Sequence, residues 1–215
     1  MKISLGIGII FCVTLLGCLT ETEDRYIFFL HNRFLETHDL NESHPEYGKT
    51  EYLEIIEEFK DNGFTVISEQ RNGNVNAHEY ATLVTALIDS LIQKGVSPKD
   101  ITVVGTSKGA YIAQYVSTLV NNKDLNFVFI ASFRESDLQD IPNINYCGHI
   151  LNIYEASDPF GVSAVKRKEN STCYIEYFKE VESHTGLGHG FLFQPMKEWM
   201  QPTMRWAKGN YNLED

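Results

Sequence analysis

Positively charged residues are scarce in this sequence. Its 215 residues include 18 Lys and Arg against 29 Asp and Glu, which gives a formal net charge of −11 at neutral pH. The only run of basic residues, 166–168, is too short to follow a chain of phosphates. The composition therefore argues against nucleic acid as a partner.

Cysteine is also rare, and its four positions divide between two parts of the chain. Cys12 and Cys18 fall in the apolar N-terminal segment, which leaves Cys147 and Cys173 for the rest of the protein. Neither of the latter belongs to a cysteine and histidine spacing that is typical of a zinc site.

One polar loop does collect groups that bind metals in other proteins. Its candidates are His38, Asp39, Glu42 and His44. Their spacing matches none of the ligand patterns typical of metal sites. We therefore expect a solvated loop here, and neither a metal nor another cofactor in the protein.

The N-terminus contains a long segment without charge. Residues 3–19 carry no charged side chain, Lys2 precedes them, and an acidic stretch over 20–24 follows. This pattern predicts a signal peptide over residues 1–20 and an exported protein. The run Leu15-Leu-Gly-Cys18 is similar to a bacterial lipoprotein box, in which Cys18 receives the lipid that holds the protein on the membrane. A simply cleaved signal, which would give a free periplasmic protein, and an uncleaved anchor remain alternatives.

The stretch from Ile101 to Val116 organises the remaining chain. Ile101, Val103 and Val104 are typical of a buried strand, and apolar residues at helical spacing begin at Ala110. Between them lies Gly105-Thr-Ser-Lys-Gly109, a G-x-S-x-G segment that joins strand to helix without a spacer. Such a turn lifts the serine hydroxyl above the edge of a sheet, although a glycine-rich turn with Ser107 merely capping the helix would look similar.

Strand and helix alternate through the rest of the chain. The pattern predicts helices over 50–62 and 76–94, with a further helix after Pro195. It predicts strands over 25–30, 64–68, 101–104, 125–132, 149–154 and 174–178. The alternation indicates a doubly wound parallel sheet of about six strands with helices on both faces, in a single domain over 25–209.

Chemically suggestive residues follow several of these strands. They are His31, Asn32, Arg33, Ser107, Asp158 and His189. Ligand sites in doubly wound sheets lie beyond the carboxyl ends of the strands. A serine hydroxyl attacks a carbonyl only when an imidazole removes its proton, and a carboxylate must orient that imidazole. Serine, aspartate and histidine occur in that order in enzymes with this turn.

On these residues the chain resembles the α/β-hydrolase family over essentially its whole length after the signal. The resemblance implies that Ser107 is the nucleophile, His189 the base and Asp158 the orienting acid. It implies an oxyanion hole formed by the backbone N–H groups of Lys108 and Arg33. The family usually has His-Gly where this chain has His31-Asn32, and the two leading antiparallel strands of larger members are absent.

Several assignments have rivals within the chain. His184 could replace His189, and the acid could be Asp137, Asp140 or Glu155. Arg71 follows the second predicted strand, so it could bind substrate together with Asn32 or could belong to a plain turn.

The resemblance also bears on the two remaining cysteines. It places the fifth and sixth strands side by side and parallel, so Cys147 and Cys173, which precede them, would lie at the same edge of the sheet. A disulfide there would persist in an exported protein, whereas two buried free thiols are the alternative.

We therefore expect an exported serine hydrolase that cleaves a small-molecule ester through an acyl-enzyme. A thioester or amide substrate is the weaker possibility. The alternative from another class is a catalytically silent binding protein on the same scaffold. The sequence leaves the substrate and the oligomeric state open.

Overall fold

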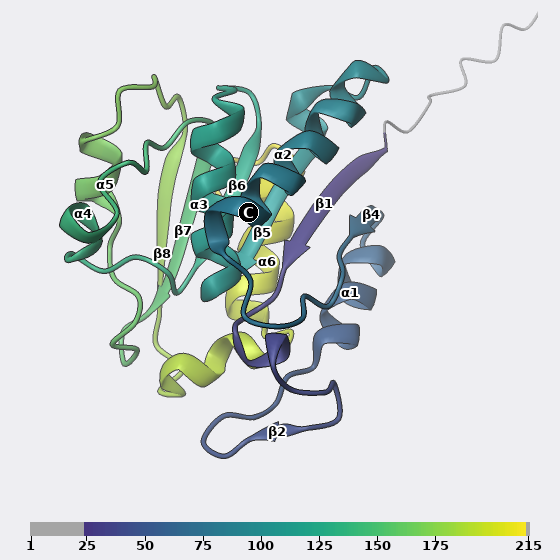
Figure 1. Ribbon diagram of the computed structural model, residues 1–215, viewed down its shortest axis with the longest axis vertical. Coiled ribbons are helices and arrows are strands. Elements are labelled where there is room, and N and C mark those ends of the chain that lie inside the picture. The colour runs from purple at the N-terminus through teal and green to yellow at the C-terminus, as the bar shows by residue number, and fades with distance from the viewer. Residues whose placement is uncertain (1–23, 214–215) are drawn as a thin grey trace, which may run out of the picture.

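The computed structural model describes residues 24–213 and is built on a sheet of six parallel strands. The strand order is β4-β1-β5-β6-β7-β8 (Figure 1). The strands are β1 (Arg25–Leu30), β4 (Phe64–Ile67), β5 (Ile101–Thr106), β6 (Asn126–Ile130), β7 (His149–Glu155) and β8 (Phe178–Ser183). The predicted fold class is confirmed.

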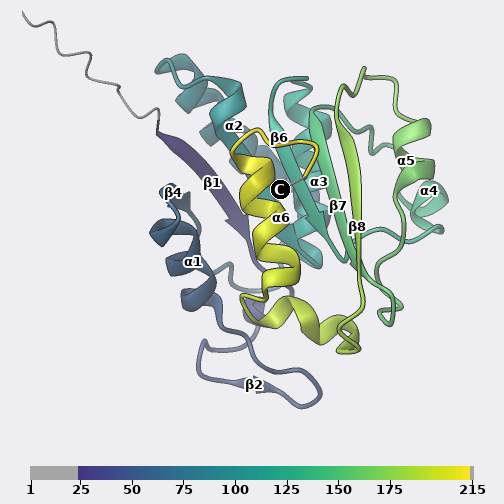
Figure 2. The same ribbon diagram turned by 180° about the vertical axis from the view of Figure 1, so that it is seen from behind.

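Helices cover both faces of the sheet because each strand presents apolar side chains on both sides. In β1, Ile27 and Phe29 pack against α1 (Tyr52–Asp61) and α6 (Lys197–Ala207). Phe28 and Leu30, on the opposite face, pack against α2 (Ala77–Gln93) and α3 (Lys108–Val120). Figure 1 shows α2 and α3 in front of the sheet, and Figure 2, the view from behind, shows α6 and α1 on the other face. This alternation on a central parallel strand buries two separate cores.

The helix boundaries follow local signals in the sequence. Asn76 caps α2, its Oδ1 accepting hydrogen bonds from the backbone N–H groups of His78 and Glu79. Two short helices, α4 (Asp137–Asp140) and α5 (Val165–Glu169), interrupt the connections around β7. No helix within residues 24–213 is both long and apolar enough to cross a membrane.

The last strand differs from its predicted position. The sequence predicts a strand over 174–178, but β8 spans Phe178–Ser183, and Tyr174 is exposed. The predicted position followed from the β-branched and aromatic content of residues 174–178, which are interrupted only by Glu176. An edge strand needs fewer apolar residues than a central one, so the charged sequence FKEVES can serve there.

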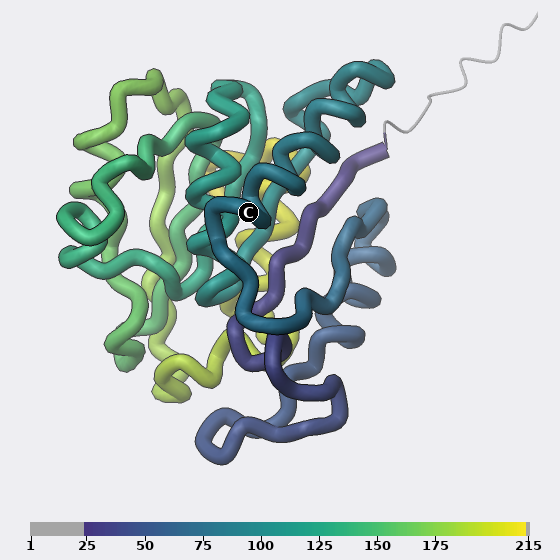
Figure 3. The backbone as a smooth tube through the Cα atoms, viewed as in Figure 1, coloured from purple at the N-terminus to yellow at the C-terminus, as the bar shows by residue number. Residues whose placement is uncertain are grey.

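The loop after β1 also has more structure than predicted. A short 3-10 helix, η1 (Phe34–Glu36), comes first, and the two-residue strands β2 (Ser43–His44) and β3 (Gly48–Lys49) then form a hairpin. The chain trace in Figure 3 shows this hairpin projecting beyond the carboxyl ends of the strands. It packs beside η3 (Gly188–Phe193), the segment that contains His189.

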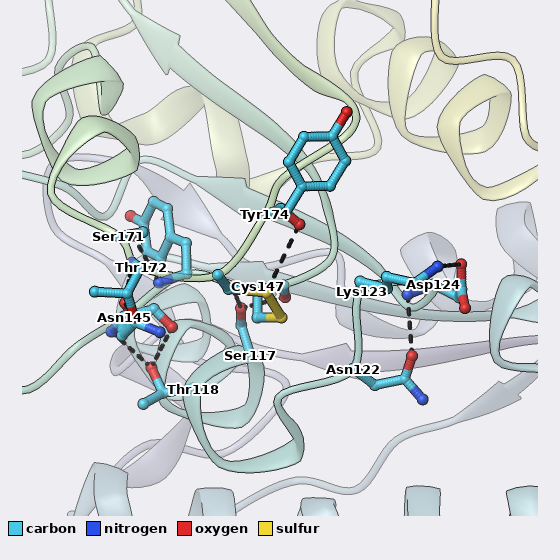
Figure 4. The surroundings of a disulfide bond; sticks show 12 residues. Ser117, Thr118, Asn122, Lys123, Asp124, Asn145, Cys147, Ser171, Thr172 and Tyr174 are labelled. Carbon is cyan, nitrogen blue, oxygen red and sulfur yellow. Dashed lines mark hydrogen bonds and ion pairs between the residues drawn. A yellow bond between two sulfur atoms is a disulfide. The ribbon is translucent and has the colours of Figure 1, made fainter.

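A disulfide joins Cys147 and Cys173 at the amino edge of the sheet, with their Cα atoms 5.3 Å apart (Figure 4). Ser117 of α3 fixes the same corner: its hydroxyl donates to the Cys147 carbonyl at 2.7 Å and accepts from the Cys147 N–H at 2.8 Å. The bond closes a loop with a sequence separation of 26 residues, which includes β7 and α5.

We predict that removing this disulfide lowers the free energy of unfolding by about 3.5 kcal/mol, because the crosslink restricts the unfolded chain. Urea unfolding of the double variant Cys147→Ala/Cys173→Ala should show this loss. A reducing agent should destabilise the wild type and leave the double variant unchanged. Two titratable thiols in the oxidised protein would contradict the prediction.

Candidate functional site

The turn between β5 and α3 holds Ser107 in a strained conformation. Ser107 has φ 51° and ψ −117°, a combination that non-glycine residues rarely adopt. Glycines on both sides permit the turn: a Cβ at Gly105 would collide with the first turn of α3, and one at Gly109 with the carbonyl of Leu30. The first turn of α3 therefore lies directly against the end of β1.

Three side chains from separate loops meet at this turn. His189 Nε2 lies 2.9 Å from Ser107 Oγ, and His189 Nδ1 lies 2.6 Å from Asp158 Oδ2. The Asp158 side chain is fully buried and also accepts a hydrogen bond from the N–H of Phe160 at 2.9 Å. This is the arrangement in which an imidazole can take a proton from a hydroxyl while a carboxylate stabilises the resulting charge.

The rival residues lie elsewhere. The His184 side chain is 73% exposed and is 4.0 Å from Glu182. Asp137 accepts hydrogen bonds from the Tyr111 hydroxyl at 2.6 Å and from the Arg134 N–H at 2.8 Å, and Asp140 is exposed on α4.

Glu155, the remaining rival acid, has a distinct environment. Its carboxylate accepts hydrogen bonds from the N–H groups of Thr185 and Gly186 and from the Ser157 hydroxyl, at 2.9, 3.1 and 2.9 Å. Burial alone would raise the pKa of this carboxyl. The hydrogen bonds outweigh burial and lower the pKa of Glu155 to about 2. Glu155 therefore holds the loop that leads to His189 while Asp158 contacts the imidazole.

The two residues expected to supply oxyanion donors flank Ser107. Lys108 is the first residue of α3, a position whose N–H has no acceptor within its own helix. Arg33 precedes η1, at the end of the loop that follows β1. Because α3 and β1 approach so closely at Gly109 and Leu30, both expected donor residues border the same cleft.

A buried polar network connects these two segments. Glu36 Oε1 lies 3.0 Å from Arg71 Nε, and Glu36 Oε2 lies 2.5 Å from Lys108 Nζ. The Glu36 and Arg71 side chains are fully buried. Glu36 therefore links the end of η1 to the residue that follows Ser107.

His31 completes the network in its neutral form. Its Nε2 accepts the N–H of Arg71 at 2.7 Å, so Nδ1 carries the proton and donates to the carbonyl of Asn32 at 2.7 Å. Burial, assisted by the charge of Arg71, lowers the pKa of His31 from 6.5 to about 3.

These contacts correct the suggestion that Arg71 binds substrate. Its guanidinium is buried against Glu36 and donates to the carbonyl of His31, and it does not line the cleft around Ser107. Asn32 was suggested to bind substrate together with Arg71. It is buried, its amide lies 3.5 Å from the Thr50 hydroxyl, and it borders part of the cleft.

The cleft around Ser107 has two lobes. The larger has a volume of about 490 Å³ and the smaller about 290 Å³. Both lobes border Arg33, His44, Tyr47, Ser107 and His189. The larger lobe continues toward Lys108, Tyr111, Ala131, Arg134 and Phe160, whereas the smaller is lined further by Phe34, Thr37, His38 and Phe193.

The hairpin contributes residues that the sequence did not single out as part of the site. The ring of Tyr47 stacks on His44, with centroids 4.4 Å apart, and also packs against Phe193 and His189. We expected a solvated loop here, but His44 borders both lobes of the cleft. The sequence feature that could have indicated this contact is the aromatic ring of Tyr47 in an otherwise polar segment. Among residues 24–213, no cluster of His, Cys, Asp and Glu is placed to hold a metal ion.

Comparison with known proteins identifies the fold. No protein-family model and no curated protein sequence matches the chain. Solved structures do match, among them an arylesterase with a TM-score of 0.58 and 13% identity, covering 90% of this chain and 78% of its own. SOBER1 from Arabidopsis thaliana matches with a TM-score of 0.54 and 17% identity, over 87% of this chain and 99% of its own. A sugar hydrolase, YeeB from Lactococcus lactis, matches with a TM-score of 0.51 and 14% identity, over 91% and 93%.

The class that these structures define is the α/β-hydrolase fold. The present chain has this fold in a small form, with six parallel strands and short connections around β7. At such low identity the likeness shows the fold and leaves the activity to be argued from the site.

The neutral state of His31 predicts a specific dependence of stability on pH. Because its folded pKa lies below the unfolded value of 6.5, its contribution is present above pH 6.5 and is lost as the pH falls toward 3. We expect this residue alone to remove about 1.5 kcal/mol of unfolding free energy between pH 6.5 and pH 5.

Urea unfolding at several pH values measures this effect. The His31→Gln variant should lose less stability than the wild type over that interval. His184→Gln, which removes an exposed imidazole, should keep the wild-type slope. Parallel stability curves for the wild type and His31→Gln would show that His31 is not the neutral buried group described above.

Proposed function

We propose that this protein is a serine hydrolase that cleaves a carboxylic ester through an acyl-enzyme. The observation that carries the proposal is the chain of hydrogen bonds from Ser107 Oγ through His189 to Asp158, at 2.9 and 2.6 Å. Ser107 Oγ attacks the ester carbonyl while His189 Nε2 takes its proton. Asp158 stabilises the imidazolium, and the N–H groups of Lys108 and Arg33 stabilise the oxyanion.

The remaining steps regenerate the enzyme. The C–O bond of the ester breaks, and the alcohol leaves with the proton that His189 returns. Water then loses a proton to His189 and attacks the acyl-enzyme, which releases the acid and restores the Ser107 hydroxyl. The strained turn at Ser107 supports this role, because strain of this kind costs stability and is concentrated at functional sites.

Ser107→Ala and His189→Ala should each reduce turnover of p-nitrophenyl acetate by about 10⁵-fold or more, because nucleophile and base act as one unit. Asp158→Asn should reduce it by roughly 10⁴-fold, since the imidazole loses its orienting charge. His184→Ala, in the same loop but exposed to solvent, is the matched control and should retain activity. An active His189→Ala variant would rule out the proposed base.

A fluorophosphonate probe separates this proposal from the alternative of a silent binding protein. Attack by Ser107 Oγ on phosphorus displaces fluoride and leaves a stable adduct on the wild type. Ser107→Ala should remain unlabelled. An unlabelled wild type of correct fold would favour the binding protein.

We also propose that the protein is exported and attached to a membrane through a lipid on Cys18, a residue that lies outside the described part of the chain. β1 starts at the amino edge of the sheet (Figure 1), whereas the residues that border the cleft follow the carboxyl ends of the strands.

Cell fractionation of a bacterial host tests the anchor. The wild type should sediment with membranes, because lipoproteins carry several acyl chains, and Cys18→Ser should be soluble or unprocessed. Ser107→Ala, which leaves residues 1–20 intact, should fractionate like the wild type. A wild type recovered only in the soluble periplasm would contradict the proposal.

A further inference from the structure

We infer, on the basis of the proposed esterase function, that the substrate carries a negatively charged group such as a carboxylate. Arg33 and Arg134 would bind this group in the larger lobe of the cleft. The inference rests on the distribution of charge around Ser107.

The lining of the larger lobe reverses the charge balance of the chain. Acidic residues outnumber Lys and Arg by 29 to 18 in the whole sequence. The larger lobe is bordered by three cationic side chains, Arg33, Lys108 and Arg134, and by one carboxylate, Glu46. Asp158 lies behind the His189 ring, with its side chain fully buried. A cleft lined mainly by one sign of charge attracts ligands of the opposite sign.

Arg33 is the most available of these cations. Its side chain is exposed and borders both lobes, and within residues 24–213 it makes no ion pair with Asp or Glu. Its backbone lies immediately after the buried residues His31 and Asn32, so its position beside Ser107 is fixed. An arginine offers five N–H donors that match the two oxygens of a carboxylate.

Lys108 adds positive charge that its buried partner does not fully cancel. Within residues 24–213, Arg71 and Lys108 both form their ion pair with one carboxylate, that of Glu36. The three side chains therefore carry a formal net charge of +1 next to Ser107. A net charge in a largely buried cluster is costly, and an anion bound nearby would reduce that cost.

Arg134 also borders the larger lobe, where it pairs with Asp137. Its side chain is 49% exposed and one of its terminal nitrogens lies 3.5 Å from Asp137. Asp137 is itself held by the Tyr111 hydroxyl. The contact with Asp137 uses one nitrogen of the Arg134 guanidinium, which has five N–H donors in all. Tyr111 and Phe160 border the space for an apolar spacer between the charged group of the ligand and the ester.

Two aryl acetates that differ in the charge of their para substituent test the inference, with release of the acetyl group as the reaction followed. The first is 4-acetoxybenzoate, and the second is its methyl ester, which has the same scissile acetyl group without the carboxylate. Arg33→Gln and Arg134→Gln should each lower kcat/KM for the anion about fivefold to tenfold more than for the methyl ester, chiefly through KM. Comparing each variant with the wild type cancels the different intrinsic reactivities of the two esters. Added NaCl should lower kcat/KM for the anionic ester and leave that for the methyl ester unchanged.

Lys123→Gln is the matched control for loss of a positive charge. Lys123 is 64% exposed, pairs with Asp124 and lies before β6, at the amino edge. The Lys123→Gln variant should leave the ratio of the kcat/KM values for the two esters unchanged. An unchanged ratio in both arginine variants would overturn the inference while leaving the esterase function standing.

Binding to Ser107→Ala gives a readout that does not depend on turnover. Equilibrium dialysis should show tighter binding of 4-acetoxybenzoate than of its methyl ester, and this preference should disappear in Ser107→Ala/Arg33→Gln. Equal binding of the two esters would overturn the inference. A preference for the anion without hydrolysis by the wild type would support the anion site and reject the esterase function.

Discussion

The close approach of α3 to the end of β1 determines the geometry of the whole site. Gly109 leaves no Cβ between the first turn of the helix and the Leu30 carbonyl. The backbone of Lys108 is consequently held beside the loop that begins at His31. A larger residue at 109 would push these segments apart, and with them the two groups proposed to bind the oxyanion. Tight packing of this kind is possible only where the chain carries glycine.

The same approach allows a polar network to replace apolar packing beneath the cleft. Glu36 can contact both Arg71 and Lys108 because the turn between β5 and α3 already lies next to η1. Burying such groups costs free energy unless each finds a partner, and His31 meets this condition as a neutral ring between the Arg71 N–H and the Asn32 carbonyl. The loop that carries Arg33 is therefore fixed by directional bonds, which specify position more narrowly than apolar contacts do.

Local sequence signals were sufficient for the central parts of the fold. The β-branched run before Gly105 and the helical spacing after it located β5, α3 and the turn with Ser107, and Asn76 marked the start of α2. The residues at the carboxyl ends of the strands were predictable as neighbours because parallel strands bring those ends to one edge. The glycines on both sides of His189 favoured it over His184, but the exposed position of His184 and the contacts of His189 appear only in the folded chain.

The failures of prediction have a common physical origin in long-range contacts. Arg71 follows a strand at the correct edge, but its charge is directed into the protein by Glu36, thirty-five residues earlier. Tyr47 reaches the cleft only because the hairpin packs against η3, near the other end of the chain. The edge strand β8 is polar because one side of it has no neighbouring strand. A prediction based on apolar residues therefore placed the strand at the wrong position. In the first two cases a partner distant in sequence decided the outcome, and in the third the position of the strand in the sheet did.

Glu155 and Asp158 show how one turn can give two carboxylates different tasks. Both are buried at the end of β7. Glu155 accepts hydrogen bonds from the backbone at Thr185 and Gly186, so its negative charge fixes the path of the chain that leads to His189. Asp158, in contrast, makes its short contact with the imidazole itself. The strongly lowered pKa of Glu155 follows from the hydrogen bonds with which it holds the loop. The contact with the imidazole is what supports Asp158 as the orienting acid of the proposed mechanism.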